Sequence, residues 1–169
     1  MKNLIVYYSL TGTNETVAMK LREMVNCEVE KIVEPVNRHG FIMFFKNGFD
    51  SLMKKTTKIE PIKSGLKSFE RIIFLTPVWA GNLPPAARTF LMENKDKLQS
   101  LVFISACVMG EKNEKLSLNV EGITGKKLES YFFIRDNDVR NGSYIEKLKA
   151  FVISLSNEWI FNFFWLKYS

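Results

Sequence analysis

Hydroxyl and amide side chains crowd one short stretch near the N-terminus, YYSLTGTNET at residues 7–16. It lies between an apolar run and a segment with helical spacing, and it contains no lysine. The free backbone N–H groups at a helix N-terminus bind anions through hydrogen bonds and the helix dipole. Ordinary helix capping by Thr11 or Thr13 is the alternative, but capping needs only one hydroxyl. The stretch therefore predicts a phosphate site without a countercharge, formed by Ser9, Thr11, Gly12, Thr13, Asn14 and Thr16.

A second stretch, TPVWAGNLPP at residues 76–85, follows a buried run and carries one aromatic residue, Trp79. Pro77 ends the preceding strand, and Gly81 with Asn82 favours a sharp turn. An aromatic ring at the rim of a pocket offers a stacking face for a flat heteroaromatic ligand. The other interpretation places Trp79 in the core as a plug, and the sequence leaves both open.

The third stretch, SACVMGEKNE at residues 105–114, begins with small residues and reaches a glycine at Gly110. A backbone of this kind can run close beside a planar ligand and present its N–H and C=O groups to the ring's edge. Cys107 either touches such a ring or is a half-buried thiol with no chemical role. Together the three stretches predict a site for a ligand with a phosphate and a flat ring.

Other phosphate chemistries lack their motifs. GxxxxGK[ST] is absent, and no GxGxxG follows the first apolar run. A cysteine phosphatase needs an arginine six positions after its cysteine, where this chain has Val33 after Cys27 and Asn113 after Cys107. A receiver domain needs acidic residues at the end of the first strand, and this chain has none there.

Apolar runs alternate with helical spacing along the chain, a pattern typical of a parallel sheet with helices on both faces. We expect one doubly wound α/β domain spanning residues 1–169, with five strands and right-handed crossovers. Ligands bind such sheets beyond the carboxyl ends of the strands, and the three stretches follow the first, third and fourth strands. The expected strands are 3–8, 27–33, 71–77, 100–107 and 128–134, and the expected helices are 14–26, 84–94 and 143–166.

Residues 35–58, PVNRHGFIMFFKNGFDSLMKKTTK, fit this alternation least easily. Gly40 and Gly48 interrupt an amphipathic segment that is rich in phenylalanine. One interpretation is a covering helix whose phenylalanines pack on the sheet. The other is a flap beside the ligand site, with His39 at its start.

Composition narrows the class of protein. The net charge is +6, but no run of five or six basic residues occurs, so we expect no nucleic-acid partner. No apolar run reaches the roughly 18 residues of a membrane span. The first residues lack the cleavage region of a signal peptide, so a cytoplasmic protein with no transmembrane segment is expected. Two cysteines outside any CxxC pair, with a single histidine, predict no metal site.

The chain resembles the flavodoxin family in IVYYSLTGTNETVA and IIFLTPVWAGNLPPAARTFL, at residues 5–18 and 72–91. The resemblance spans nearly the whole chain and implies the short-chain form, with FMN as cofactor and strand order 2-1-3-4-5. It places the phosphate on the first stretch, where Thr13-Asn14 replaces the family's usual Asn-Thr order. It places the isoalloxazine between two loops: Thr76, Pro77, Val78, Trp79, Ala80 and Gly81 in one, and Ser105, Ala106, Cys107, Val108, Met109 and Gly110 in the other.

The resemblance implies a redox protein that carries one or two electrons and uses no side-chain acid or base. Three functions remain open. The first is a carrier that docks on a redox partner protein, and the second is an FMN-dependent oxidoreductase that takes hydride from NAD(P)H and reduces quinones or similar acceptors. The third is an interaction module without cofactor. The aromatic tail WIFNFFWLKYS at residues 159–169 could pack on the sheet, form a homodimer surface or lie on a membrane.

Overall fold

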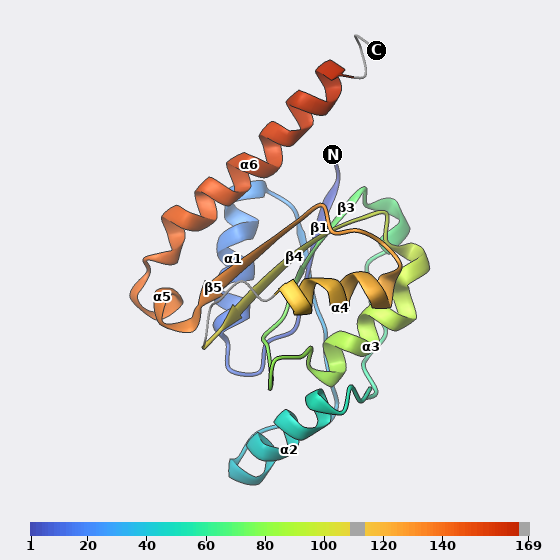
Figure 1. The fold of residues 1–169 in the computed structure, drawn as a ribbon, viewed down its shortest axis with the longest axis vertical. Helices are drawn as coiled ribbons and strands as arrows, with labels where there is room; N and C mark the ends of the chain where they lie inside the picture. Colours follow the sequence, from blue (N-terminus) through green and yellow to red (C-terminus); the bar gives the residue numbers. More distant parts are fainter. Residues whose placement is uncertain (109–113, 166–169) are drawn as a thin grey trace.

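Five parallel strands form one sheet between two layers of helices (Figure 1). This computed structural model describes residues 1–108 and 114–165, with side chains described for residues 1–108 and 115–155. All five predicted strands are present, although their ends shift by a few residues. They are β1 (Asn3–Tyr7), β2 (Glu28–Lys31), β3 (Arg71–Leu75), β4 (Ser100–Cys107) and β5 (Ser130–Arg135).

The order of the strands is β2-β1-β3-β4-β5, as the resemblance implies. Ile5 of β1 lies opposite Val29 of β2 on one side and Ile73 of β3 on the other. The winding of the chain therefore reverses between β1 and β3, and ligand sites of doubly wound sheets lie at such a reversal. Because all strands are parallel, the residues that follow β1, β3 and β4 meet at one edge of the sheet.

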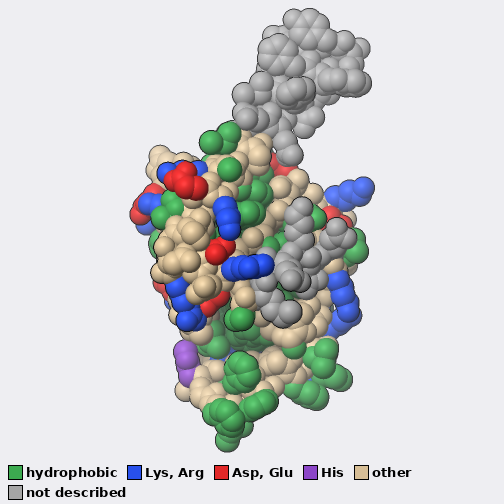
Figure 2. Space-filling model, turned by 60° about the vertical axis from the view of Figure 1, so that its left-hand side comes forward, with side chains coloured by type: hydrophobic (Ala, Val, Ile, Leu, Met, Phe, Trp, Pro, Cys, Tyr) green, Lys and Arg blue, Asp and Glu red, His purple; other side chains and the backbone are tan. Residues whose placement is uncertain are grey.

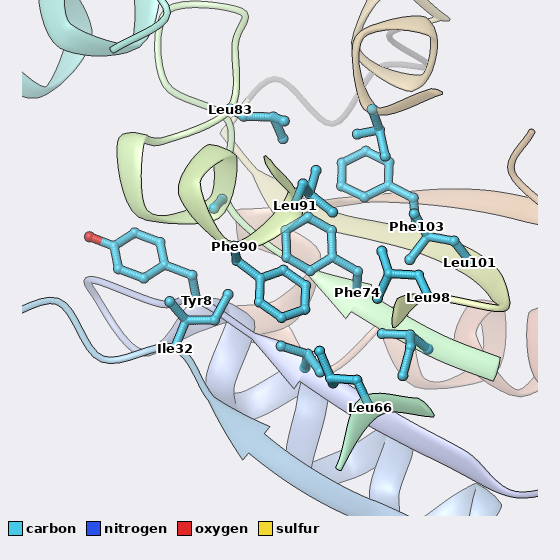
Figure 3. Packing of buried hydrophobic residues seen from close by; sticks show 14 of the residues in the cluster. Tyr8, Ile32, Leu66, Phe74, Leu83, Phe90, Leu91, Leu98, Leu101 and Phe103 are labelled. Atoms are coloured by element: carbon cyan, nitrogen blue, oxygen red, sulfur yellow. The ribbon is translucent and has the colours of Figure 1, made fainter. Parts of the chain in front are cut away.

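Alternate residues of the strands face two separate cores. On one face, Leu4 and Val6 lie under α3 (Pro85–Asn94) and α4 (Glu114–Thr124). On the other, Ile5 and Tyr7 lie under α1 (Thr13–Val25) and α6 (Tyr144–Trp165). Figure 3 shows the first core, where the ring of Phe74 stacks on Phe90 and Phe103 at centroid distances of 5.4 and 6.0 Å. The continuous apolar strands predicted this burial on both faces.

The sequence predicted α1, α3 and α6 but gave no bounds for α4 or for α5 (Asp136–Asn141). Helix α4 buries only a narrow apolar stripe that includes Leu116 and Val120, and it contains Gly122. The side chains of the aromatic tail lie outside the described residues, so its three alternatives stay open. Among the helices that the structure describes, none is both long enough and apolar enough to cross a membrane.

Helix α2 (Phe41–Leu52) occupies the segment that fitted least easily, and it lies at one end of the molecule (Figure 1). The prediction that its phenylalanines pack on the sheet is wrong. The helix buries its polar residues Asn47, Asp50 and Ser51, and its apolar side chains face outward (Figure 2). Its polar face is turned inward by a buried ionic network that the sequence did not reveal.

Candidate functional site

Helix α1 begins at Thr13, and the residue before it, Gly12, has a left-handed backbone with φ of 91°. The hydroxyl of Ser9 accepts a hydrogen bond from the Gly12 N–H at 3.1 Å and so closes the loop after β1. No side chain caps the helix. Within the described part of the chain, no hydrogen bond uses the backbone N–H of Thr13, Asn14 or Glu15. These three donors point out of the first turn, as an anion site at a helix terminus requires.

Two of the predicted phosphate ligands bond to other parts of the protein. The amide of Asn14 donates to the Ala106 carbonyl and accepts from the Ala106 N–H, both at 3.0 Å, and it is buried. The hydroxyl of Thr13 donates to a carboxylate oxygen of Asp136 at 2.6 Å. Asn14 therefore fixes the start of α1 against the end of β4, and its backbone N–H has no partner among the described residues.

The remaining hydroxyls of this loop are accessible. Thr11 is exposed at the tip of the loop. Thr16 is also exposed, and its hydroxyl donates to the Gly12 carbonyl at 3.2 Å. A hydroxyl can donate only one proton, and Thr16 uses its own on Gly12. Among the described residues, neither the Thr11 hydroxyl nor the Ser9 hydroxyl donates a hydrogen bond.

The loop after β3 ends in a two-residue turn. Trp79 and Asn82 exchange two backbone hydrogen bonds of 3.0 Å across Ala80 and Gly81. Both central residues have positive φ, 47° for Ala80 and 72° for Gly81, which is the pattern of a type I′ turn. The sequence predicted a sharp turn at Gly81-Asn82. The structure centres it one residue earlier, which places Ala80 in a backbone conformation that glycine usually occupies.

Trp79 is half-buried at the junction of the two loops. Its ring packs edge-on against Tyr8 at a centroid distance of 5.8 Å, and it also contacts the core under α3. The plug and the stacking platform are therefore not exclusive, because one part of the ring packs inward and the rest stays accessible. Of the same loop, Thr76 is buried, Pro77 and Val78 are half-buried, and Ala80 and Gly81 are exposed.

The loop after β4 begins beside the other two. Ser105 is buried and donates to the Thr76 carbonyl at 2.6 Å, so the ends of β3 and β4 are joined by a side chain. Ala106 is buried against Asn14, whereas Cys107 is half-buried and Val108 is exposed. Met109 and Gly110 lie outside the described residues. The structure thus brings the beginnings of all three predicted stretches to one edge of the sheet.

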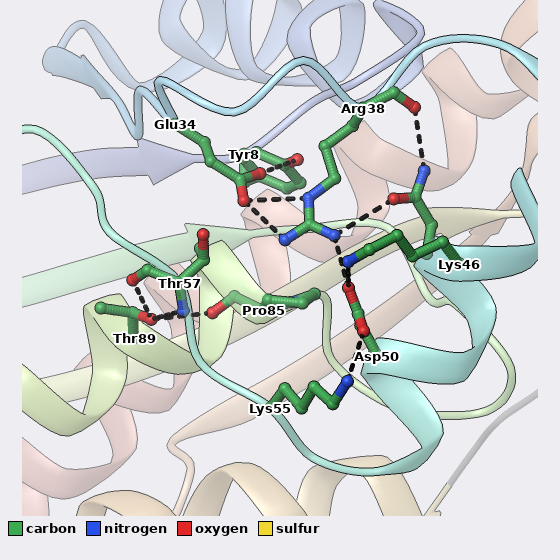
Figure 4. A network of polar contacts seen from close by, with 10 residues as sticks. Tyr8, Glu34, Arg38, Lys46, Asp50, Lys55, Thr57, Pro85 and Thr89 are labelled. Atoms are coloured by element: carbon green, nitrogen blue, oxygen red, sulfur yellow. Dashed lines mark hydrogen bonds and ion pairs between the residues drawn. The ribbon is translucent and has the colours of Figure 1, made fainter. Parts of the chain in front are cut away.

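A buried ionic network holds α2 over this edge (Figure 4). The guanidinium of Arg38 donates to Glu34 at 2.7 Å and to Asp50 at 2.9 Å, and Glu34 also accepts from the Tyr8 hydroxyl at 2.9 Å. Lys46 and Lys55 complete the network on Asp50. A Cβ added to Gly48 would lie 3.9 Å from the Cβ of Ala80, so α2 abuts the turn that carries Trp79.

The network makes the free energy of unfolding depend on pH in the acid range. Burial alone would raise the pKa of Asp50, but the hydrogen bonds from Lys46, Lys55 and Arg38 outweigh it and lower that pKa well below its ordinary value. A carboxylate with a depressed pKa in the folded state stabilises the protein above its unfolded pKa of about 4. The contribution is lost as the pH falls from there toward the folded pKa.

We expect urea unfolding to show this loss directly. The difference in unfolding free energy between wild type and Asp50→Asn should be largest near neutral pH and shrink below about pH 4. Asp96→Asn is the control, because Asp96 is exposed and forms no ion pair with the part of the chain that is described. A difference for Asp50→Asn that stays constant down to low pH would contradict the expectation.

Sequence reasoning missed Asp136, Glu34, Arg38 and Asp50. Only the i,i+4 spacing of Lys46 and Asp50 on a helix gave a signal. The described residues hold no cluster of His, Cys, Asp and Glu suited to a metal. A surface hollow of about 690 Å³ lies between residues 59–68 and the end of α3, and it shares no residue with the three loops.

Known structures resemble the chain in backbone, whereas no family model and no curated protein matches its sequence. A flavoprotein of Lactobacillus acidophilus in complex with FMN superimposes with a TM-score of 0.69 at 18% identity, over 87% of this chain and 97% of its own. The oxidised flavodoxin 2 of Bacillus cereus gives 0.56 at 14% identity, over 94% and 99%. The Fusobacterium nucleatum flavodoxin bound to flavin mononucleotide gives 0.55 at 12% identity, over 94% and 99%. At these identities the likeness shows the fold, and the chain has the fold of flavodoxins.

Proposed function

We propose that this protein binds FMN at the carboxyl edge of its sheet and carries electrons. One observation supports the proposal above the others: among the described residues, the N–H groups of Thr13, Asn14 and Glu15 at the start of α1 have no hydrogen-bond partner. Trp79 packs against Tyr8, from which the chain runs into the same loop. A Cβ added to Gly12 would meet no atom of the described residues within 4 Å beyond its chain neighbours, so the loop is not crowded at this position. The donor set is uncharged, which suits a terminal phosphate held by helix N–H groups.

The roles of the chain's residues follow from their positions. The first turn of α1, with Thr11 and Ser9, would hold the phosphate, and Trp79 would border one face of the ring. The backbone of the Val78–Gly81 turn and the start of the loop after β4 would face the ring's edge. FMN, when bound, supplies the one- and two-electron chemistry. The chain contributes binding, orientation and hydrogen bonds, and it needs no catalytic acid or base.

The direct test is titration of the apoprotein with FMN, followed by quenching of flavin fluorescence. Gly12→Val should weaken binding about tenfold or more, because a β-branched residue cannot hold a φ of 91° without strain. Gly122→Val, in α4 and away from the loops, is the matched control and should bind like wild type. Wild-type protein that quenches no flavin fluorescence at saturating FMN would refute the proposal.

The carboxylate of Asp136 gives a sharper prediction. It accepts a hydrogen bond from Thr13 at the mouth of the phosphate site, and its charge is partly offset by Arg140 at 2.7 Å. Asp136→Asn keeps an acceptor for Thr13 and removes a charge that repels phosphate. We expect FMN affinity to rise about fivefold, as for about 1 kcal/mol of Coulomb repulsion. Asp138→Asn on the same helix is the control, and an unchanged or lower affinity for Asp136→Asn would contradict the prediction.

Direct reduction by a nicotinamide nucleotide is the second candidate function. The net charge of +6 favours it, because a basic surface attracts the phosphates of NAD(P)H and makes docking on a basic partner unfavourable. Anaerobic mixing of FMN-loaded protein with NADPH or NADH separates the two functions. Fast stoichiometric bleaching of the flavin supports the oxidoreductase, and absence of bleaching supports a carrier that depends on a redox partner protein.

A further inference from the structure

Helix α2 is amphipathic, but its polar side faces the protein and its apolar side faces outward. Figure 2 shows apolar side chains gathered at the α2 end of the molecule. Ile42 is 81% exposed and Phe41 is 79% exposed, and every member of this apolar face is more than half exposed. The face consists of Phe41, Ile42, Phe44, Phe45, Phe49, Leu52 and Met53. Contiguous exposed apolar patches on soluble domains mark interaction surfaces.

Buried ion pairs fix the outward direction of this face. Turning the helix over would expose Asn47 and break the ion pair between Asp50 and Arg38. The side chains of both Asp50 and Arg38 are only 4% exposed. The chain after α2 is held as well, because Thr57 and Thr89 exchange hydrogen bonds of 2.9 and 3.0 Å (Figure 4). The apolar face is therefore a property of the folded chain that its inner contacts enforce.

The exposed lysines, arginines and carboxylates within residues 39–58 are all lysines, and so all positive. Lys46, Lys54, Lys55 and Lys58 are exposed between residues 39 and 58, and the only carboxylate in that range, Asp50, is buried and paired. Lys54 and Lys58 form no ion pair with the described residues. Phenylalanines on one side of a helix with lysines at its margin are the composition of helices that lie in the membrane interface.

We propose that α2 docks this protein onto an anionic lipid surface, with the apolar face between the headgroups and Lys54 and Lys58 beside them. The shape favours a bilayer over a protein partner, because α2 is a convex end of the molecule that a flat, deformable surface can receive (Figure 1). The lysines complement the lipid charge, and no exposed carboxylate of residues 39–58 opposes it. The proposal does not depend on FMN binding.

Vesicle co-sedimentation of the full chain tests it, with phosphatidylcholine vesicles compared with phosphatidylcholine–phosphatidylglycerol vesicles. Wild type should bind the anionic vesicles and lose binding as salt rises. Phe44→Ser/Phe45→Ser and Lys54→Glu/Lys58→Glu should each weaken binding about tenfold. Leu118→Ser is the matched control, because Leu118 is also exposed but lies on α4. Circular dichroism of each variant checks that its fold is retained.

Four results would overturn the proposal. Wild type that binds neither kind of vesicle has no lipid-docking face, and wild type that binds both equally does not recognise anionic lipid. Double variants that bind like wild type place any membrane contact elsewhere, for example at the aromatic C-terminal tail. A concentration-dependent dimer in sedimentation velocity, abolished by Phe44→Ser/Phe45→Ser, assigns the face to a second copy of the chain.

Discussion

Replacing Arg38 by methionine is expected to lower the free energy of unfolding by about 3–5 kcal/mol, as when one partner of a buried ion pair is removed. The side chains of Glu34, Arg38 and Asp50 are at most 4% exposed. Asp50 keeps Lys46 and Lys55 when Arg38 is lost, but Glu34 keeps only the Tyr8 hydroxyl among the side chains that the structure describes. Most of the loss therefore comes from a carboxylate left buried without its cation.

Urea denaturation measures this loss, and Arg22→Met is the control because Arg22 is exposed on α1. The variant Glu34→Gln/Arg38→Met should recover much of the stability, since it removes the charge that Arg38→Met leaves unpaired. A loss below about 1 kcal/mol for Arg38→Met would mean that the network behaves like a surface ion pair.

The sheet was predictable because its signal is local. Each of the four strands β1, β3, β4 and β5 carries apolar residues on both faces, and this pattern is visible within six to eight letters of sequence. Strand β2 is more exposed and its alternation was visible too. Strand order came from the resemblance to flavodoxins rather than from any one segment.

Helix α2 shows where sequence reasoning fails. Its apolar spacing is that of a helix that covers a core, and spacing alone cannot tell which face turns inward. The direction is decided by Arg38, which precedes the helix, and by Glu34 and Tyr8, which lie further back in the chain. Contacts among residues that are distant in sequence leave no periodic trace.

Part of the candidate site was predictable from the sequence and part was not. Its loops were predictable because strand ends, glycines and hydroxyls mark them, and the sheet brings them together. The role of each side chain was not predictable. Thr13 bonds to Asp136, which is 123 positions away in the sequence, and Asn14 bonds to Ala106, which is 92 positions away. From the sequence, Asn14 was one of several equal candidate phosphate ligands, whereas in the structure its side chain joins the start of α1 to the end of β4.

That position leads to the second large expected effect, in the variant Asn14→Leu. Leucine has nearly the same size but cannot donate to the Ala106 carbonyl or accept from its N–H. Both backbone groups would remain buried without partners, at about 1–3 kcal/mol each. We expect the free energy of unfolding to fall by about 2–6 kcal/mol, with unfolding by urea as the measurement.

If the first turn of α1 holds the phosphate, Asn14→Leu should also weaken FMN binding at a temperature where the variant is folded, because the N–H donors lose their anchor to β4. Thr16→Val is the matched control, since its hydrogen bond to Gly12 lies at the exposed side of the same turn. The free energy of unfolding of the control should fall by less than about 0.5 kcal/mol, as it does for most substitutions of exposed residues. If Thr16→Val lowered the free energy of unfolding as much as Asn14→Leu does, the anchoring role of Asn14 would be contradicted. A large loss of stability with unchanged FMN affinity would instead separate the anchor from the phosphate site, and it would mean that the donors at the start of α1 keep their geometry without β4.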